Sequence, residues 1–219
     1  MTHLHDPRPV VVPRTVTFDS LLIDFDDRVL EPRPWTVAQS TWAADLMRSA
    51  PHGPVLEVCA GAGHIGLLAI AREARPLVSV DLNPVASDYT RANAERAGLA
   101  DLVEVREGAL DAVLEPDERF AVVIADPPWV PRADTGRYPE DPRLAIDGGD
   151  DGLDLARACW RLADHHLLEG GSAVLQLGTT DQARRLVDEA GAGTRLRVEE
   201  TRVFERGVLV ALTAGPLRS

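Results

Sequence analysis

The stretch Val55-Leu-Glu-Val-Cys-Ala-Gly-Ala-Gly-His-Ile-Gly66 decides the fold of this chain. Its first five residues, to Cys59, read as a short buried strand, and the glycines that follow mark a tight turn into a helix. Such a turn lets the backbone approach a ligand closely, and the next helix presents free N–H groups to it. The turn alone does not identify the ligand, because dinucleotide enzymes use the same G-x-G-x-x-G spacing.

Short apolar runs alternate with helical patterns on the C-terminal side of this turn. Asn83 is a good helix cap, Pro84 suits a first helical turn, and the helix should end near Gly98. A second helix is expected over 153–168, ended by Gly170-Gly171. The alternation predicts βαβ units, and therefore a parallel sheet with right-handed crossovers. The further strands are expected at Leu77–Asp81, Leu102–Arg106, Phe120–Ala125 and Ala173–Leu177.

The end of the chain breaks this alternation. Two strand-like runs, Leu196–Phe204 and Val208–Thr213, are separated by Glu205-Arg206-Gly207 and no helix, which predicts a hairpin. A parallel sheet that closes on an antiparallel hairpin is typical of class I methyltransferases, whereas nicotinamide-binding domains usually stay parallel. We therefore expect an α/β, Rossmann-like class I methyltransferase fold: a mostly parallel seven-stranded sheet with a C-terminal antiparallel hairpin and helices on both faces.

The length of 219 residues suits one α/β domain with a short extension. Residues 1–50 should form an N-terminal arm or hairpin and a helix, 36–49, that cover the cofactor site. Residues 51–219 should form the catalytic domain. A second substrate domain has no room in this length.

Composition argues against a nucleic-acid or membrane partner. The formal net charge is −12, all 23 basic residues are Arg, and they form no basic stripe, so the attraction that holds proteins on phosphates is missing. No apolar run is long enough to span a membrane and the start does not read as a signal peptide. Cys59 and Cys159 are expected to be reduced and buried, without metal spacing. A soluble cytoplasmic protein is expected, with no metal site.

Two acids next to the strand ends indicate S-adenosylmethionine (SAM) as the cofactor. Glu57 precedes the glycines, where a carboxylate would meet the cationic amino-acid end of SAM directly or through water. Asp81 ends the second strand, where an acid accepts both ribose hydroxyls. An acid after the third strand commonly accepts the adenine amine, but Ala109 stands there, so Asp111 or the backbone of 108–110 would replace it. Further expected contacts are Cys59, Ala60, Gly61, Gly63, Leu82, Gly108, Ala109 and Asp126.

The fourth strand delivers Asp126-Pro127-Pro128-Trp129 at its carboxyl end, where open α/β sheets place their ligands. Two prolines stiffen the chain, so they should hold the Asp126 side chain and the Pro127 carbonyl in fixed directions. These two acceptors would orient a nitrogen in line with the sulfur-to-methyl bond, and Trp129 would pack on the planar substrate group. The four residues, Pro128 included, are the predicted catalytic segment.

This segment, with Ala145-Ile-Asp-Gly-Gly-Asp-Asp-Gly-Leu-Asp154, resembles the HemK-type glutamine methyltransferases, which modify the side-chain amide of a Gln in peptide-release factors. Val29-Leu-Glu-Pro-Arg-Pro-Trp-Thr36 is similar to the family's Pro-Arg-Pro-x-Thr segment, which lies across the SAM site. The resemblance implies that Pro32 and Thr36 contact the cofactor. It covers most of residues 18–180.

Departures from the family pattern fall where the substrate is chosen. Asp126 and Trp129 replace the Asn and Tyr of the family's Asn-Pro-Pro-Tyr motif, and Trp35 replaces an acid. Asp in the first position is more typical of enzymes that methylate exocyclic amines of adenine or guanine. The extra helical domain of bacterial release-factor enzymes cannot be formed by residues 1–50, whereas shorter relatives work with a small zinc-binding activator.

The leading hypothesis is therefore a SAM-dependent N-methyltransferase that acts on an amide or amine nitrogen of a protein side chain or small molecule. Three alternatives stay open at this point. They are a nucleobase exocyclic-amine methyltransferase, a small-molecule tailoring methyltransferase of secondary metabolism, and an inactive SAM-fold scaffold. A small activator subunit or a homodimer is compatible with each of them.

Overall fold

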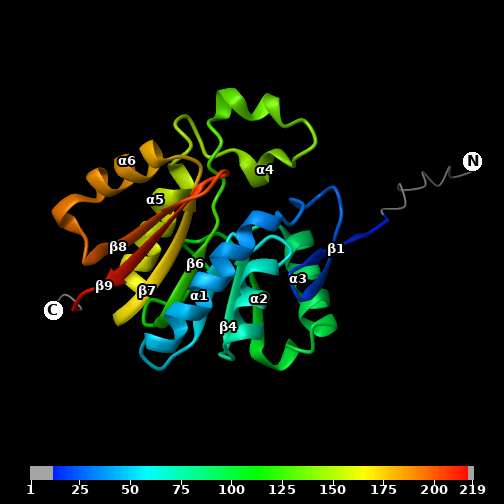
Figure 1. The fold of residues 1–219 in the computed structure, drawn as a ribbon, viewed down its shortest axis with the longest axis horizontal. Helices are drawn as coiled ribbons and strands as arrows, with labels where there is room; N and C mark the ends of the chain where they lie inside the picture. Colours follow the sequence, from blue (N-terminus) through cyan, green and yellow to red (C-terminus); the bar gives the residue numbers. More distant parts are fainter. Residues whose placement is uncertain (1–11, 217–219) are drawn as a thin grey trace, which may run out of the picture.

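The computed structural model describes residues 12–216 and contains one central seven-stranded sheet with a separate small hairpin (Figure 1). The strand order in the sheet is β5-β4-β3-β6-β7-β9-β8. Strands β3 to β7 run parallel, whereas β9 runs antiparallel to both β7 and β8. The sheet strands are β3 (Val55–Val58), β4 (Leu77–Asp81), β5 (Val103–Glu107), β6 (Phe120–Ala125), β7 (Leu167–Leu177), β8 (Leu196–Val203) and β9 (Val208–Ala214). This confirms the predicted class I methyltransferase architecture.

Helices cover both faces of the sheet, and strand alternation decides which side chains meet which helices. Val123 and Ala125 of β6 pack in a cluster with α5 and α6, whereas Val122 and Ile124 pack with α1 and α2. Both β3 and β6 are buried along their whole length, as central strands of a covered parallel sheet must be. The helices are α1 (Val37–Ser49), α2 (His64–Arg72), α3 (Pro84–Arg96), α4 (Arg143–Ile146), α5 (Asp154–His166) and α6 (Thr180–Ala190).

The N-terminal part forms a hairpin of β1 (Arg14–Phe18) and β2 (Leu21–Phe25), followed by a short 3-10 turn, Pro34–Thr36, and α1. Apolar side chains of the hairpin join a core cluster with α2 and α3. The buried Asn93 of α3 fastens the hairpin through hydrogen bonds with the backbone N–H and carbonyl of Asp24, and it also donates to the carbonyl of Ala62. The segment that joins the hairpin to α1 is thereby brought against the glycine turn.

Local signals predicted most element ends, with one clear exception. Asn83 caps α3 by accepting a hydrogen bond from Val85 N, and Gly98, with φ of 70°, follows the helix end as predicted. The expected end of α5 at Gly170-Gly171 is wrong, because α5 ends at His166 and β7 begins at Leu167. Leu167 is fully buried and pairs with Phe120, so pairing with β6 overrides the local helix pattern and places both glycines inside a strand.

Candidate active site

A cavity of about 370 Å³ lies at the carboxyl ends of β3, β4, β5 and β6, the edge where the sequence placed the cofactor. Its walls are mainly apolar, and the acids Asp81 and Asp126 line it from the ends of β4 and β6, the two strands that flank β3. Both the glycine turn and the proline-stiffened segment therefore contribute to one cavity. Of the predicted cofactor contacts, its lining includes Cys59, Ala60, Gly61, Asp81, Leu82, Gly108, Ala109 and Asp126.

The turn between β3 and α2 takes three consecutive odd-numbered residues into the left-handed region. Cys59, Gly61 and Gly63 have φ of 58°, 56° and 77°. A Cβ on Gly63 would come within 2.7 Å of Thr90, whose hydroxyl donates to the Gly61 carbonyl, so glycine is needed there for close packing on α3. Gly63 itself is not in the cavity lining. It shapes the turn, and Cys59 and Gly61 form the wall.

Asp81 is held by the backbone of two segments. One carboxylate oxygen accepts from Gly61 N at 2.7 Å and the other accepts from Asn83 N at 2.8 Å. Burial raises the pKa of this carboxyl, and these backbone hydrogen bonds act in the opposite direction. Each oxygen keeps a lone pair free, so Asp81 can accept from a diol while its direction stays fixed.

Glu57 lies behind the cavity wall instead of in it. Its carboxyl is 2% exposed, accepts from Gly66 N at 2.7 Å and Ser79 Oγ at 3.1 Å, and is absent from the cavity lining. Burial raises its pKa to about 7, with the Gly66 and Ser79 hydrogen bonds opposing. In this geometry Glu57 is therefore not placed for the expected direct contact with a cofactor. Glu57 fixes the first turn of α2 against β4.

Asp126 projects into the cavity without a protein partner. Within residues 12–216 no hydrogen bond or ion pair reaches its carboxyl, and burial raises its pKa to about 7. The backbone behind it is fixed, because the buried Gln39 of α1 donates to the carbonyl of Ala125 at 2.9 Å. A carboxyl with a pKa near neutrality and free lone pairs is suited to accept an N–H hydrogen bond and then a proton.

Both of the groups predicted to receive the adenine amine, the backbone of residues 108–110 and the Asp111 side chain, belong to residues at this cavity. Gly108, Ala109, Leu110 and Asp111 all line the cavity. Leu82, which follows β4 and is 56% exposed, also lines the cavity. Apolar side chains and a run of peptide groups are thus present at this end, which suits a flat heterocycle.

Trp129 does not line the cavity, and neither do the predicted site residues Pro127, Pro32 and Thr36. A Cβ on Gly178 would overlap the Trp129 ring, so the indole packs on the turn after β7. The Trp129 carbonyl accepts from Gln182 of α6 at 2.9 Å. In this arrangement Trp129 is not placed for the predicted stacking on a substrate in the cavity. Pro128, in contrast, does line the cavity.

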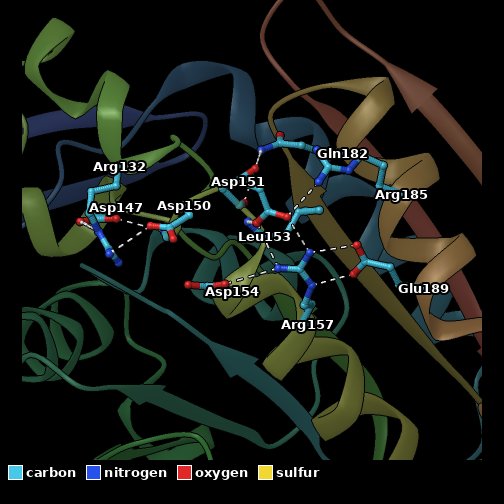
Figure 2. A network of polar contacts seen from close by, with 12 residues as sticks. Arg132, Asp147, Asp150, Asp151, Leu153, Asp154, Arg157, Gln182, Arg185 and Glu189 are labelled. Atoms are coloured by element: carbon cyan, nitrogen blue, oxygen red, sulfur yellow. Dashed lines mark hydrogen bonds and ion pairs between the residues drawn. The ribbon is translucent and has the colours of Figure 1, made fainter.

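Gln182 joins three loops through one side-chain amide, as Figure 2 shows in part. Its nitrogen donates to the carbonyls of Trp129, Asp151 and Gly152, and its oxygen accepts from the backbone N–H groups of Gly178 and Thr179. Arg157 adds a bidentate ion pair with Asp151 and another with Glu189 (Figure 2). The loop 146–154 is thereby fixed beside the Asp126–Trp129 segment.

Sequence reasoning missed the mouth and one side of the cavity. Pro142, Leu144 and Ala145, from the irregular loop around α4, line its outer part, and Leu144 is 63% exposed. Leu155, Ala158 and Arg161 of α5 form a side wall. The segment before the Pro-Arg-Pro motif also contributes, through Arg28, Val29 and Leu30. Only the i, i+3, i+6 spacing of the α5 residues could have indicated a shared face.

Comparison with known proteins shows which proteins this chain resembles. A family model described as conserved hypothetical protein 95 matches residues 37–135. The release factor glutamine methyltransferase of Geobacter sulfurreducens is 37% identical over 61% of this chain and 49% of its own length. That of Deinococcus radiodurans is 35% identical over 74% of this chain and 59% of its own length. This chain is thus similar in sequence to the glutamine methyltransferases.

Solved structures agree on the fold. An RNA methyltransferase from Salinibacter ruber in complex with S-adenosyl-L-homocysteine (SAH) covers 87% of this chain, and this chain covers 97% of it, at 18% identity and a TM-score of 0.53. The chain spans about half the length of the curated relatives it matches. In the part that the structure describes, no helix has the length and apolar character needed to cross a membrane.

Proposed function

We propose that this chain is a SAM-dependent N-methyltransferase whose acceptor is an amide nitrogen, with the side-chain amide of a protein glutamine as the favoured class. The observation that carries the proposal is the unpartnered Asp126 carboxyl in a cavity shared with the glycine turn and Asp81. The names of the related proteins, release factor and ribosomal protein uL3 glutamine methyltransferases, support the amide class. The net charge of −12 disfavours a nucleic-acid acceptor.

The residues present fit SAM. Asp81 is oriented to accept a ribose diol, and the walls formed by Leu82 and 108–110 suit an adenine ring. When bound, SAM supplies a methyl group on a positively charged sulfur. The ionised Asp126 carboxylate favours a cation in this mainly apolar cavity, where the attraction is less screened than in water.

Asp126 also has the chemistry that the acceptor nitrogen needs. An amide nitrogen delocalises its lone pair, so it must be held with its N–H groups on hydrogen-bond acceptors while the lone pair faces the methyl group. Asp126 provides such an acceptor, and Gln39 and Gln182 hold the backbone on its two sides. With a pKa near 7, the carboxyl can take the proton that the nitrogen loses.

The test is transfer of label from methyl-labelled SAM to a panel of acceptors: glutamine-containing peptides, a cell-protein extract, small amines and RNA. We expect label on an amide nitrogen in the peptide or protein samples, and a loss of at least about 100-fold in Asp126→Ala, which removes the hydrogen-bond acceptor. Asp88→Ala, at an exposed aspartate, is the matched control. Measured SAM binding without label on any nitrogen would contradict the proposal, and label in RNA alone would replace the acceptor class.

A further inference from the structure

His64 is a buried polar side chain that has no hydrogen-bond partner among the residues that the structure describes. It is the first residue of α2, is 9% exposed and lines the cavity. Its ring packs edge-to-face on Phe18 with the centroids 4.8 Å apart. Nδ1 is buried without a hydrogen-bond partner, and within residues 12–216 no hydrogen bond to the imidazole exists. An unpartnered buried polar group is costly, so a ligand that pairs with the ring would recover free energy.

The backbone around His64 has unused donors as well. In the same turn, Gly63 N donates to the Ala60 carbonyl, Gly66 N to Glu57, and Leu67 N to the Gly63 carbonyl. In the part of the chain that the structure describes, the N–H groups of His64 and Ile65 have no such acceptor. Both residues line the cavity. Since α2 has nine residues, the positive end of its dipole acts at this point and favours an anion.

The cavity is lined by both acidic and basic side chains. Asp126, which has no partner among the described residues, is the acceptor that suits an ammonium group, with the buried Glu57 behind the wall. Arg28 and Arg161 also line the cavity, and the guanidinium of Arg28 forms an ion pair with Asp26. Burial lowers the pKa of His64 to about 3, so its imidazole is neutral at physiological pH and carries one N–H donor.

We infer that His64 donates a hydrogen bond from its imidazole N–H to the carboxylate at the methionine end of the cofactor, together with the free N–H groups of the first turn of α2. The inference rests on the proposed function, because it assigns a contact to the same cofactor. An acceptor role toward the ammonium group is disfavoured, because the helix N-terminus repels a cation. His64 is thus a cofactor-binding residue that no sequence pattern indicated.

The experiment measures binding by calorimetry, so it needs no methyl acceptor. Three ligands are titrated: SAH, its decarboxylated analogue, and 5′-methylthioadenosine, which lacks the whole amino-acid end. The variants are His64→Phe, which keeps an aromatic ring against Phe18, and His64→Asn, which restores an N–H donor. His52→Phe, at an exposed histidine, is the matched control, and thermal unfolding shows that each variant is folded.

We expect His64→Phe to weaken SAH about tenfold, the effect of one hydrogen bond to a charged group, and to change the other two ligands less than about twofold. His64→Asn should recover part of the loss. An equal loss for all three ligands, or no loss for SAH, would overturn the inference, and a loss shared by SAH and the decarboxylated analogue would assign the contact to the ammonium group instead. If the wild-type chain bound neither SAH nor 5′-methylthioadenosine, the proposed function itself would fail.

Discussion

Two neighbouring strands, β3 and β6, each carry one acid near the carboxyl end, and among the described residues only one of these acids has hydrogen-bond partners. Burial raises the pKa of both Glu57 and Asp126 to about 7. Glu57 has two hydrogen-bond donors from the protein, whereas the described residues give Asp126 none. Asp126 instead faces the cavity, while its flanking backbone is fixed by Gln39 and Gln182. A satisfied buried acid stabilises a fold, and an unsatisfied one on a rigid backbone is available for a ligand.

The largest effect should come from removing the satisfied acid. Glu57→Ala leaves the Gly66 N–H and the Ser79 hydroxyl without an acceptor and opens a void, so we expect a loss of about 3 kcal/mol in the free energy of unfolding. For a chain of this size the melting temperature should fall by about 10 °C. Glu205→Ala, at an exposed glutamate, should change it by less than about 1 °C. Unchanged stability with weakened SAH binding would show that Glu57 serves the cofactor directly.

A smaller loss of stability is expected from removing Gln182, which holds the backbone after β6. Gln182→Ala removes the donor to three carbonyls and the acceptor for two backbone N–H groups, so unfolding should become easier by about 2 kcal/mol. Because Gln182 lies outside the cavity lining, SAH affinity should stay within about twofold. Arg184→Ala, on the same helix with an exposed ion pair, is the control for chemical denaturation. A large loss of SAH affinity in a folded Gln182 variant would contradict this separation.

The unsatisfied acid should have the opposite effect on stability. The folded pKa of Asp126 lies above its unfolded value. The protonated carboxyl therefore contributes stability that is fully present below pH 4 and is lost as the pH rises through about 7. Asp126→Asn carries no charge, and we expect it to melt at least about 3 °C higher than the wild type at pH 8 and nearly equally at pH 4. Thermal unfolding at the two pH values measures this. A destabilised variant at pH 8 would indicate that the carboxylate has a partner in the folded protein.

The smallest effect concerns the charge of the cofactor. SAM has a cationic sulfur and SAH does not, so ionisation of Asp126 should favour SAM selectively. We expect the preference for SAM over SAH to increase about fivefold between pH 6 and pH 8 in the wild type, which is about 1 kcal/mol. The preference should be flat in Asp126→Asn, as competition calorimetry can show. An equal increase in both proteins would assign the titration to another group.

Most of the fold could be predicted because its signals are local. Buried runs such as Phe120–Ala125, the Asn83-Pro84 cap and the terminal hairpin each carry their own pattern. The end of α5 could not be predicted, because Leu167 is decided by pairing with a distant strand. At the site, types and spacing indicated Asp81, Asp126 and the turn, all of which reach one cavity.

The directions in which these side chains point could not be predicted from the sequence. Glu57 is turned by donors from Gly66 and Ser79, and the latter comes from a different strand. The Trp129 ring occupies the space that is left because Gly178 has no side chain. His64 follows the glycines like an ordinary helix residue, and only its missing partner in the folded chain distinguishes it. Each of these directions depends on contacts between segments that are far apart in the sequence.

The most direct test of the account is a crystal structure of the chain with SAH. We predict the ribose hydroxyls on Asp81, the adenine between Leu82 and residues 108–110, and the sulfur beside the Asp126 carboxyl, with the methionine carboxylate at the start of α2. SAH bound outside the cavity, or inside it with Asp126 turned away from the sulfur, would contradict the claim that the ends of β3 and β6 form one methyl-transfer site.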